Sequence, residues 1–266
     1  MSTTLWPQVQ APQAGSLEDL LLRIQRKADA PPPSRSGRLG RLGRFLRALG
    51  HPVARTPALA EVLAHLMPKV RPRSAYAAYA RETGQPAPEW RPLAGNLAVS
   101  LVADLPNQDL DLDAAQLQAW NADFDLLLQR ARTNLLGRGV ERGFQEVRPG
   151  CCRSAWRNGL DGSLMLLPGV LRRLPVQGEP VAVLPDRDAL LVTGAEDAQG
   201  LVWILEAALE HLDQDPEALG ALPLRLRDGC WEPLRLAGDH PAAALLDRLE
   251  RRCQGAAPPA PGVMAA

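Results

Sequence analysis

Residues 181–194, VAVLPDRDALLVTG, place two short aliphatic runs on either side of a Pro-Asp-Arg-Asp core. Short runs of this kind, bounded by turn formers, are typical of buried strands. Proline presets the φ angle of a turn, and aspartate side chains accept backbone N–H groups there. The segment therefore predicts two core strands joined by a tight turn, and no other stretch of the chain combines so much order with so much charge.

The elements expected after this segment set the fold class. Residues 197–212 carry apolar side chains at helical spacing, and Asp228-Gly229 favours a tight hairpin between residues 222–227 and 230–236. A last helix is expected over residues 241–252. The order strand, strand, helix, strand, strand, helix predicts an α+β fold, in which a mixed or antiparallel sheet packs against several amphipathic helices.

Four further elements are expected before residue 140. Thr56-Pro57 begins a helix that Pro68 should stop, residues 74–82 form a weaker helix, and residues 96–104 alternate as a half-buried strand does. Asp113 caps a longer helix that ends at Gly137. The buried face of the first helix is expected to be Leu59, Val62, Leu63 and Leu66, and the stripe of the longer one Leu117, Trp120, Phe124, Leu127, Leu128, Ala131 and Leu135.

Composition predicts three regions in the chain. Among its 266 residues are 25 prolines and 22 glycines, and its two ends are too poor in large apolar residues to offset the entropy lost on ordering. We expect a tail, a short helix over residues 16–28 and a basic linker in residues 1–50, an α+β domain in residues 51–254, and a disordered tail in residues 255–266. A division of the domain into two subdomains near residues 137–160 stays open.

Charge and hydropathy exclude several classes of function. Thirty Lys and Arg residues balance thirty Asp and Glu residues, so no overall field draws the protein to nucleic acid or to an anionic membrane. The sequence has no run of about 20 apolar residues that could span a membrane. Its first residues include neither the basic segment nor the apolar segment of a secretion signal. With only four cysteines, a soluble cytoplasmic protein with reduced thiols is expected.

The common catalytic and metal-binding motifs are missing. The four histidines are never paired at metal-ligand spacing, and the sequence has no C-x-x-C, Walker, dinucleotide-binding or G-x-S-x-G motif. We therefore predict no catalytic residue, no metal site and no cofactor. Asp109, Asp111 and Asp113 imitate the start of a calcium loop, but Ala114 and Trp120 stand where glycine and a bidentate carboxylate are needed. We interpret these aspartates as a solvated helix entry.

Adjacent cysteines at 151 and 152 allow two interpretations. Arg148 and Arg153 nearby would favour thiolates that bind a soft metal or sense oxidants. No resolving cysteine stands at useful spacing, which favours two buried cysteines that act as small hydrophobic residues. Whether the pair is redox active stays open.

A basic segment near the N-terminus repeats arginine every third residue. A three-residue step does not keep side chains on one face of an α-helix, and three glycines interrupt the segment. A flexible charged linker is the favoured interpretation, and an arm that binds phosphates is the alternative, through which alone nucleic acid is a possible partner. Deleting residues 31–50 should then abolish salt-sensitive retention on heparin. The residues of the possible arm are Arg35, Arg38, Arg41, Arg44 and Arg47.

Several segments, in this order, resemble the bacterial YtpQ-like family, a domain of unknown function, over residues 53–236. They are LAVSLVADL at 97–105, ARTNL at 131–135, DGSLML at 161–166, VAVLPDRDALLV at 181–192, Pro223-Leu224 and Gly229-Cys230-Trp231. The resemblance implies a cytoplasmic α+β protein and supplies no activity, substrate or catalytic residue. Arg187 and Asp188 match positions of the family pattern, whereas Asp186 stands where a small polar residue is expected. The basic N-terminal extension and the Cys151-Cys152 pair have no counterpart there.

The Pro-Asp-Arg-Asp core has a structural and a functional interpretation. As a tight turn, it uses its aspartates to accept backbone amides and pairs Arg187 with a carboxylate. As a binding site, Arg187 binds a carboxylate or phosphate, Asp188 orients it, and Asn134 and Asp161 complete a polar pocket. A hydrolytic variant would need Asp161, Asp186 and Asp188 to hold a divalent cation together. The turn is favoured, because Asp and Pro are ordinary turn residues.

We therefore expect a non-catalytic binding or adaptor module with a protein partner. The alternative is a metal-dependent or Arg-assisted hydrolase that acts on a phosphate-bearing substrate. Carboxylates of Asp161, Asp186 and Asp188 gathered around one pocket would favour the enzyme, and carboxylates that cap backbone amides would favour the binding module.

Overall fold

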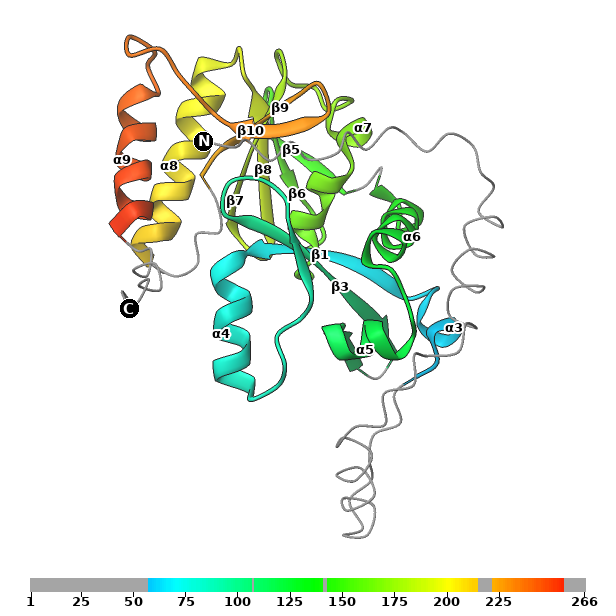
Figure 1. Cartoon of the computed structure of the whole chain (residues 1–266). Coiled ribbons are helices and arrows are strands. Elements are labelled where there is room, and N and C mark those ends of the chain that lie inside the picture. The colour runs from blue at the N-terminus through cyan, green and yellow to red at the C-terminus, as the bar shows by residue number, and fades with distance from the viewer. Residues whose placement is uncertain (1–56, 107, 141–142, 215–221, 256–266) are drawn as a thin grey trace, which may run out of the picture.

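The computed structural model describes residues 57–106, 108–140, 143–214 and 222–255 (Figure 1). The expected helix at 16–28, the five arginines at 35–47 and most of the C-terminal tail lie outside the described residues. Among the helices within these ranges, none is long and apolar enough to cross a membrane.

A six-stranded antiparallel sheet contains the segment that dominates the sequence. Its strand order is β10-β9-β7-β8-β6-β5. The two aliphatic runs form its central strands, and the predicted hairpin at Asp228-Gly229 joins its last two strands with φ angles of 49° and 85°. The strands are β5 (Phe144–Arg148), β6 (Cys151–Ser154), β7 (Pro180–Asp186), β8 (Ala189–Gly194), β9 (Leu224–Arg227) and β10 (Cys230–Pro233).

A second antiparallel sheet is built around one long strand. β3 (Leu97–Leu105) pairs with β1 (Leu66–Pro72) along one edge and with β2 (Trp90–Pro92) and β4 (Gln108–Asp111) along the other. Residues 97–103 are all buried, so β3 is covered on both faces instead of being half-buried as its alternation predicts. β1 is an edge strand, and its free edge meets the 3₁₀ helix η2 (Asp161–Leu166), where the Ser163 hydroxyl donates to the Pro68 carbonyl at 2.7 Å.

Helices pack on both sheets. Their bounds are α3 (Leu59–Val62), α4 (Arg73–Thr83), α5 (Ala114–Ala119), α6 (Phe124–Gly137), α7 (Pro168–Leu171), α8 (Ala198–Gln214) and α9 (Ala243–Gly255). The fold class predicted from the order of elements, α+β with antiparallel sheets and amphipathic helices, is confirmed.

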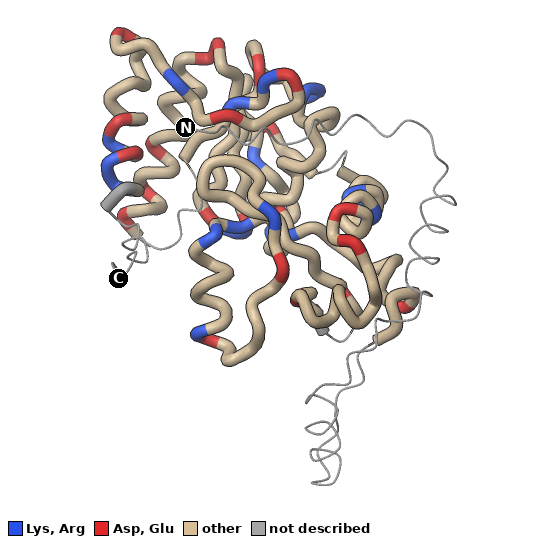
Figure 2. Tube along the Cα trace, in the orientation of Figure 1, with Lys and Arg blue, Asp and Glu red and all other residues tan. Residues whose placement is uncertain are grey.

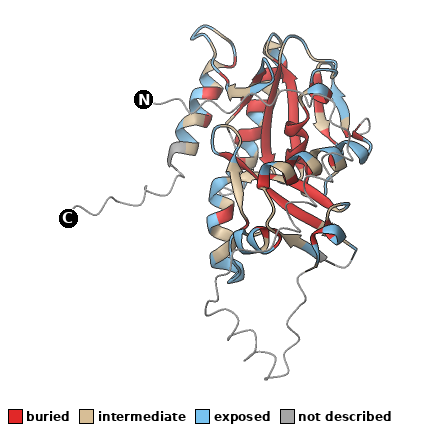
Figure 3. Cartoon of the chain, turned by 45° about the vertical axis from the view of Figure 1, so that its right-hand side comes forward, coloured by how far each residue is buried: buried red, intermediate tan, exposed pale blue. Residues whose placement is uncertain are grey.

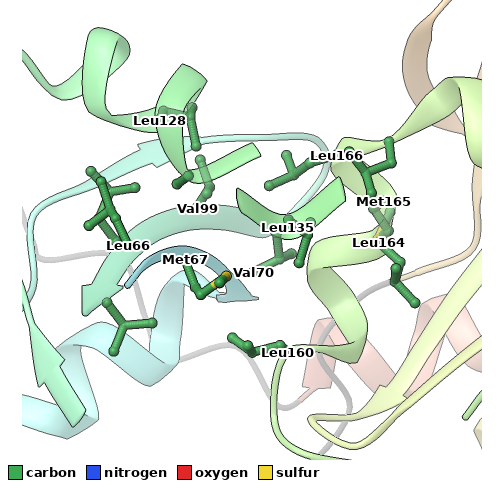
Figure 4. Close-up of a cluster of buried hydrophobic side chains, with 14 of the residues drawn as sticks. Leu66, Met67, Val70, Val99, Leu128, Leu135, Leu160, Leu164, Met165 and Leu166 are labelled. Atoms are coloured by element: carbon green, nitrogen blue, oxygen red, sulfur yellow. The ribbon is translucent and has the colours of Figure 1, made fainter. Parts of the chain in front are cut away.

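The alternation of side chains in β7 and β8 divides the core into two clusters. Val181, Val183 and Leu191 pack with α8 and α9 on one face of the six-stranded sheet. Ala182 and Leu190 belong to a larger cluster on the other face of this sheet. The larger cluster also includes residues from the strands of the four-stranded sheet and from the helices that pack on it. Figure 3 shows the buried strands of both sheets between more exposed helices. Figure 4 shows part of the larger cluster, where leucines and methionines of β1, α6 and η2 interdigitate.

Two further expectations for the first half of the chain were wrong. The helix expected from Thr56-Pro57 is only the four residues of α3, and Leu66 begins β1 instead. Pro68 lies inside this strand, where an edge position tolerates a residue without an N–H group. The long helix capped by Asp113 is two helices, because Asn121 has a left-handed φ of 48° and Asp123 caps α6 anew.

Candidate functional site

The β7–β8 connection is a turn held by its own aspartates. The Asp188 amide donates to Asp186 Oδ1 at 2.6 Å, and Arg187 Nε donates to Asp188 Oδ2 at 3.3 Å. The other oxygen of Asp186 lies 3.6 Å from His211 Nε2 of α8. This is the turn geometry that the residue types predict. The Arg187 side chain remains 69% exposed, so most of its donors face solvent.

Two carboxylates fix the loop over residues 157–159. Asp161, which is fully buried, accepts the amides of Arg157 and Asn158 at 3.2 Å. Asp188 accepts the amide of Gly159 at 2.7 Å. Arg157 and Gly159 both have positive φ angles, 51° and 76°, which turns three consecutive amides toward these carboxylates. Asp161 and Asp188, distant in sequence, therefore hold one loop together.

Asn134 lies elsewhere. Its side-chain amide donates to the carbonyls of Leu63 and Leu66, both at 2.9 Å. These bonds tie α6 to the chain that enters β1. The structure therefore does not bring Asn134 to Arg187 and Asp188, as the binding interpretation of the turn requires, because its amide serves the packing of a helix.

A cleft of about 640 Å³ opens between the four-stranded sheet and the two loops just described. In Figure 2, several basic positions gather near the middle of the molecule, where β1 approaches the β7–β8 turn. Lys69 and Arg71 lie on the same face of β1 because alternate residues of a strand share a face. The cleft's cations are Lys69, Arg71, Arg138, Arg157 and Arg187, and its carboxylates are Asp104, Asp109 and Asp188.

Ion pairs neutralise part of this lining. Lys69 Nζ lies 3.1 Å from Asp111 Oδ1, and Arg138 pairs with Asp104. Arg187 pairs with Asp188 through Nε. The guanidinium groups of Arg71 and Arg157 make no hydrogen bond or ion pair with any residue that the structure describes. These two cations are therefore unpaired within the described residues, and Arg187 adds the donors that its single contact with Asp188 leaves free.

Arg71 differs from the other cations in its environment. Burial lowers the pKa of Arg71, and the neighbouring charge of Arg187 lowers it further, whereas Tyr76, Asp111 and Asp188 raise it. An arginine stays protonated in proteins, so this side chain is a charge partly removed from water that forms no ion pair with a carboxylate of the described residues. An anion that enters the cleft would accept hydrogen bonds from Arg71 in place of those that the guanidinium has lost to water.

The carboxylates proposed for a metal are used by the backbone. Asp161, Asp186 and Asp188 each accept at least one main-chain amide. Within the described ranges, no three His, Cys, Asp or Glu side chains are grouped so that they could hold a metal ion. The arrangement suits the recognition of an anion by arginine side chains.

Sequence reasoning did not find Lys69, Arg71, Arg138 or Arg157. A signal for the first two exists, because Lys69 and Arg71 alternate around the apolar Val70 as strand residues do. Treating Pro68 as the end of a helix concealed it. Arg138 directly follows α6, and Arg157 begins the loop over residues 157–159. Only the tertiary structure brings them to β1.

Cys151 and Cys152 are buried in β6, as the small-hydrophobic interpretation predicts. Burial raises the pKa of both thiols, that of Cys152 to about 11. Cys151 Sγ lies 3.6 Å from Thr193 Oγ1. Both cysteines are therefore protonated near neutral pH and lack the thiolate character of a reactive site.

Comparisons with known family models, with curated proteins and with solved structures each find no match for this chain.

Proposed function

We propose that this protein is a non-catalytic binding module that captures an anionic group, a carboxylate or a phosphate, in the cleft between its two sheets. The observation that carries the proposal is Arg71, a partly desolvated guanidinium that forms no ion pair with the described residues, in a cleft whose lining has four further cations and three carboxylates. Guanidinium groups bind carboxylate and phosphate oxygens through paired N–H donors.

The loop over residues 157–159 supports this proposal. Its three amides already donate to Asp161 and Asp188, so an anion would be bound by side chains and not by backbone N–H groups. The same bonds hold the backbone of Arg157 in one conformation before a ligand arrives. A site arranged in advance loses less entropy on binding.

The hydrolase remains less well supported than the binding module. A metal-dependent reaction needs two or three carboxylates free to coordinate a cation. Asp161, Asp186 and Asp188 are instead engaged with backbone amides, which is the outcome expected for a binding module.

We also propose, on the support of the sequence, that the protein is cytoplasmic, binds a protein partner and belongs to the bacterial YtpQ-like family. The partner interaction is tested by affinity capture from a lysate with the full chain and with a variant that lacks residues 1–50. Partners retained by both would bind the globular part. Partners lost with the deletion would bind the N-terminal region, where the arginine repeat lies.

Isothermal titration with inorganic phosphate tests the anion site. The full chain is compared with Arg71→Gln, with Arg157→Gln and with a control, Arg173→Gln, which removes the same charge from an exposed position outside the cleft. Loss of a charged hydrogen bond at Arg71 should weaken binding about tenfold or more, and Arg173→Gln should leave it unchanged. Absence of binding to the full chain, or equal affinities of the Arg71 and Arg173 variants, would contradict the proposal.

A further inference from the structure

The cleft also contains Asp109, a carboxylate without a partner among the residues that the structure describes. Asp104 and Asp109 lie directly opposite each other in the β3–β4 pair, and Arg138 neutralises Asp104 alone. The exposed side chain of Asp109 makes no hydrogen bond or ion pair with the residues that the structure describes. Because Arg138 neutralises Asp104, the charge that stays unpaired in this opposed pair is that of Asp109.

Free donors and the free acceptor lie toward different ends of the cleft. Arg71 pairs with Ala98 of β3, and Asp109 pairs with Asp104, six residues further along the same strand. Six residues span about 20 Å of strand, so a ligand that contacts both ends must extend well beyond a single phosphate group. Within the described lining, unpaired Arg71 lies toward one end of the cleft and the unpaired carboxylate of Asp109 toward the other.

The rest of the lining narrows the class of ligand. Val102 and Leu160 are the apolar side chains there, and the described lining includes no aromatic ring on which a nucleobase would stack. Two unpaired guanidinium groups match a phosphate monoester, which carries about two negative charges and three acceptor oxygens, better than a single carboxylate. A free carboxylate such as Asp109 accepts hydrogen bonds from hydroxyl groups.

We infer that the ligand is a phosphorylated polyhydroxy compound, such as a sugar phosphate. Its phosphate binds Arg71 and Arg157, and its hydroxyl groups donate to Asp109. This inference rests on the proposed anion-binding function and adds the chemical class of the ligand.

Titration of the full chain with a series of probes tests the inference. The probes are inorganic phosphate, glucose 6-phosphate, ribose 5-phosphate, glycerol 3-phosphate, glucose, malonate and adenosine monophosphate. At least one of the sugar or polyol phosphates should bind about tenfold or more tightly than inorganic phosphate, because it adds hydrogen bonds to a charged acceptor. Glucose alone should bind far more weakly.

Asp109→Ala should remove this advantage and leave the affinity for inorganic phosphate unchanged or slightly higher. The control, Asp239→Ala, removes an exposed carboxylate outside the cleft and should change neither affinity. Phosphate binding without an advantage for any sugar or polyol phosphate would overturn this inference alone, as would tighter binding of malonate or adenosine monophosphate. Failure of every anion to bind would overturn the proposed function as well.

Discussion

Single polar residues in this protein divide into those that hold the chain and those that face the cleft. Ser163 and Asn134 bond backbone groups of segments that are distant in sequence, and Asp161 accepts the amides of the loop just before it. Arg71, Arg157 and Asp109 have no such partners within the described ranges. A sequence lists these residues without saying which group each belongs to, since the difference depends on the tertiary neighbours.

Asn134→Ala should destabilise the fold without affecting the cleft. The variant removes the side-chain donor of the Leu66 carbonyl and one of the two side-chain donors of the Leu63 carbonyl, which still accepts from Arg130 Nε at 3.3 Å. A loss of about 1–3 kcal/mol in the free energy of unfolding is expected. Urea denaturation measures the loss. Thr133→Ala, at the neighbouring exposed position, should cost less than about 0.5 kcal/mol. Equal stabilities of the two variants would show that Asn134 does not tie α6 to β1.

Stability should decrease at alkaline pH because of Cys152. Burial raises the pKa of this thiol from 9.0 to about 11, so the unfolded chain loses the proton before the folded protein does. The free energy of unfolding contributed by Cys152 is therefore complete below pH 9 and is lost as the pH rises toward about 11. Denaturation at a series of pH values across this range measures the free energy of unfolding. It should decline less steeply with pH for Cys152→Ala than for the unmodified chain. For Cys230→Ala, which changes an exposed thiol, it should decline in parallel with the unmodified chain.

Elements were predictable where periodicity and turn chemistry agree. The two aliphatic runs became β7 and β8, and the stripe after residue 197 became α8, because tertiary packing uses the same faces that the sequence displays. β1 was missed because apolar residues before Pro68 match a helical spacing by chance and a strand edge tolerates the proline. The break between α5 and α6 rests on a left-handed Asn121, which apolar spacing does not reveal.

Substitution of Gly200, with Gly137 of α6 for comparison, tests how closely α8 packs on the six-stranded sheet. A Cβ at Gly200 would overlap the Thr193 hydroxyl and the Asp197 carboxylate, so Gly200→Ala should cost about 1–3 kcal/mol. A Cβ at Gly137, at the end of α6, meets no atom within 4 Å. Gly137→Ala should therefore stabilise the protein by about 0.4–1 kcal/mol. Thermal unfolding compares the two, and shifts in the same direction would contradict this packing.

At the scale of the whole molecule, the candidate site arises where two sheets meet. The turn at Asp186–Asp188 was recognised from the sequence, and the structure brings Asp161 to the same loop through the amides of residues 157–159. The cations of β1 come from a part of the chain more than 80 residues earlier, and no local pattern in the sequence indicates that the two parts meet. The charge balance of the complete chain is zero, so a basic cleft of this kind has no signature in composition.

The location of a bound anion tests the central claim most directly. Crystals of the full chain grown or soaked with selenate or tungstate, tetrahedral anions that scatter anomalously, would show where the protein binds a phosphate-like group. The account predicts an anomalous peak in the cleft within hydrogen-bonding distance of Arg71 and Arg157, and its loss in Arg71→Gln. Peaks confined to other surfaces, or a cleft peak that persists unchanged in Arg71→Gln, would contradict it.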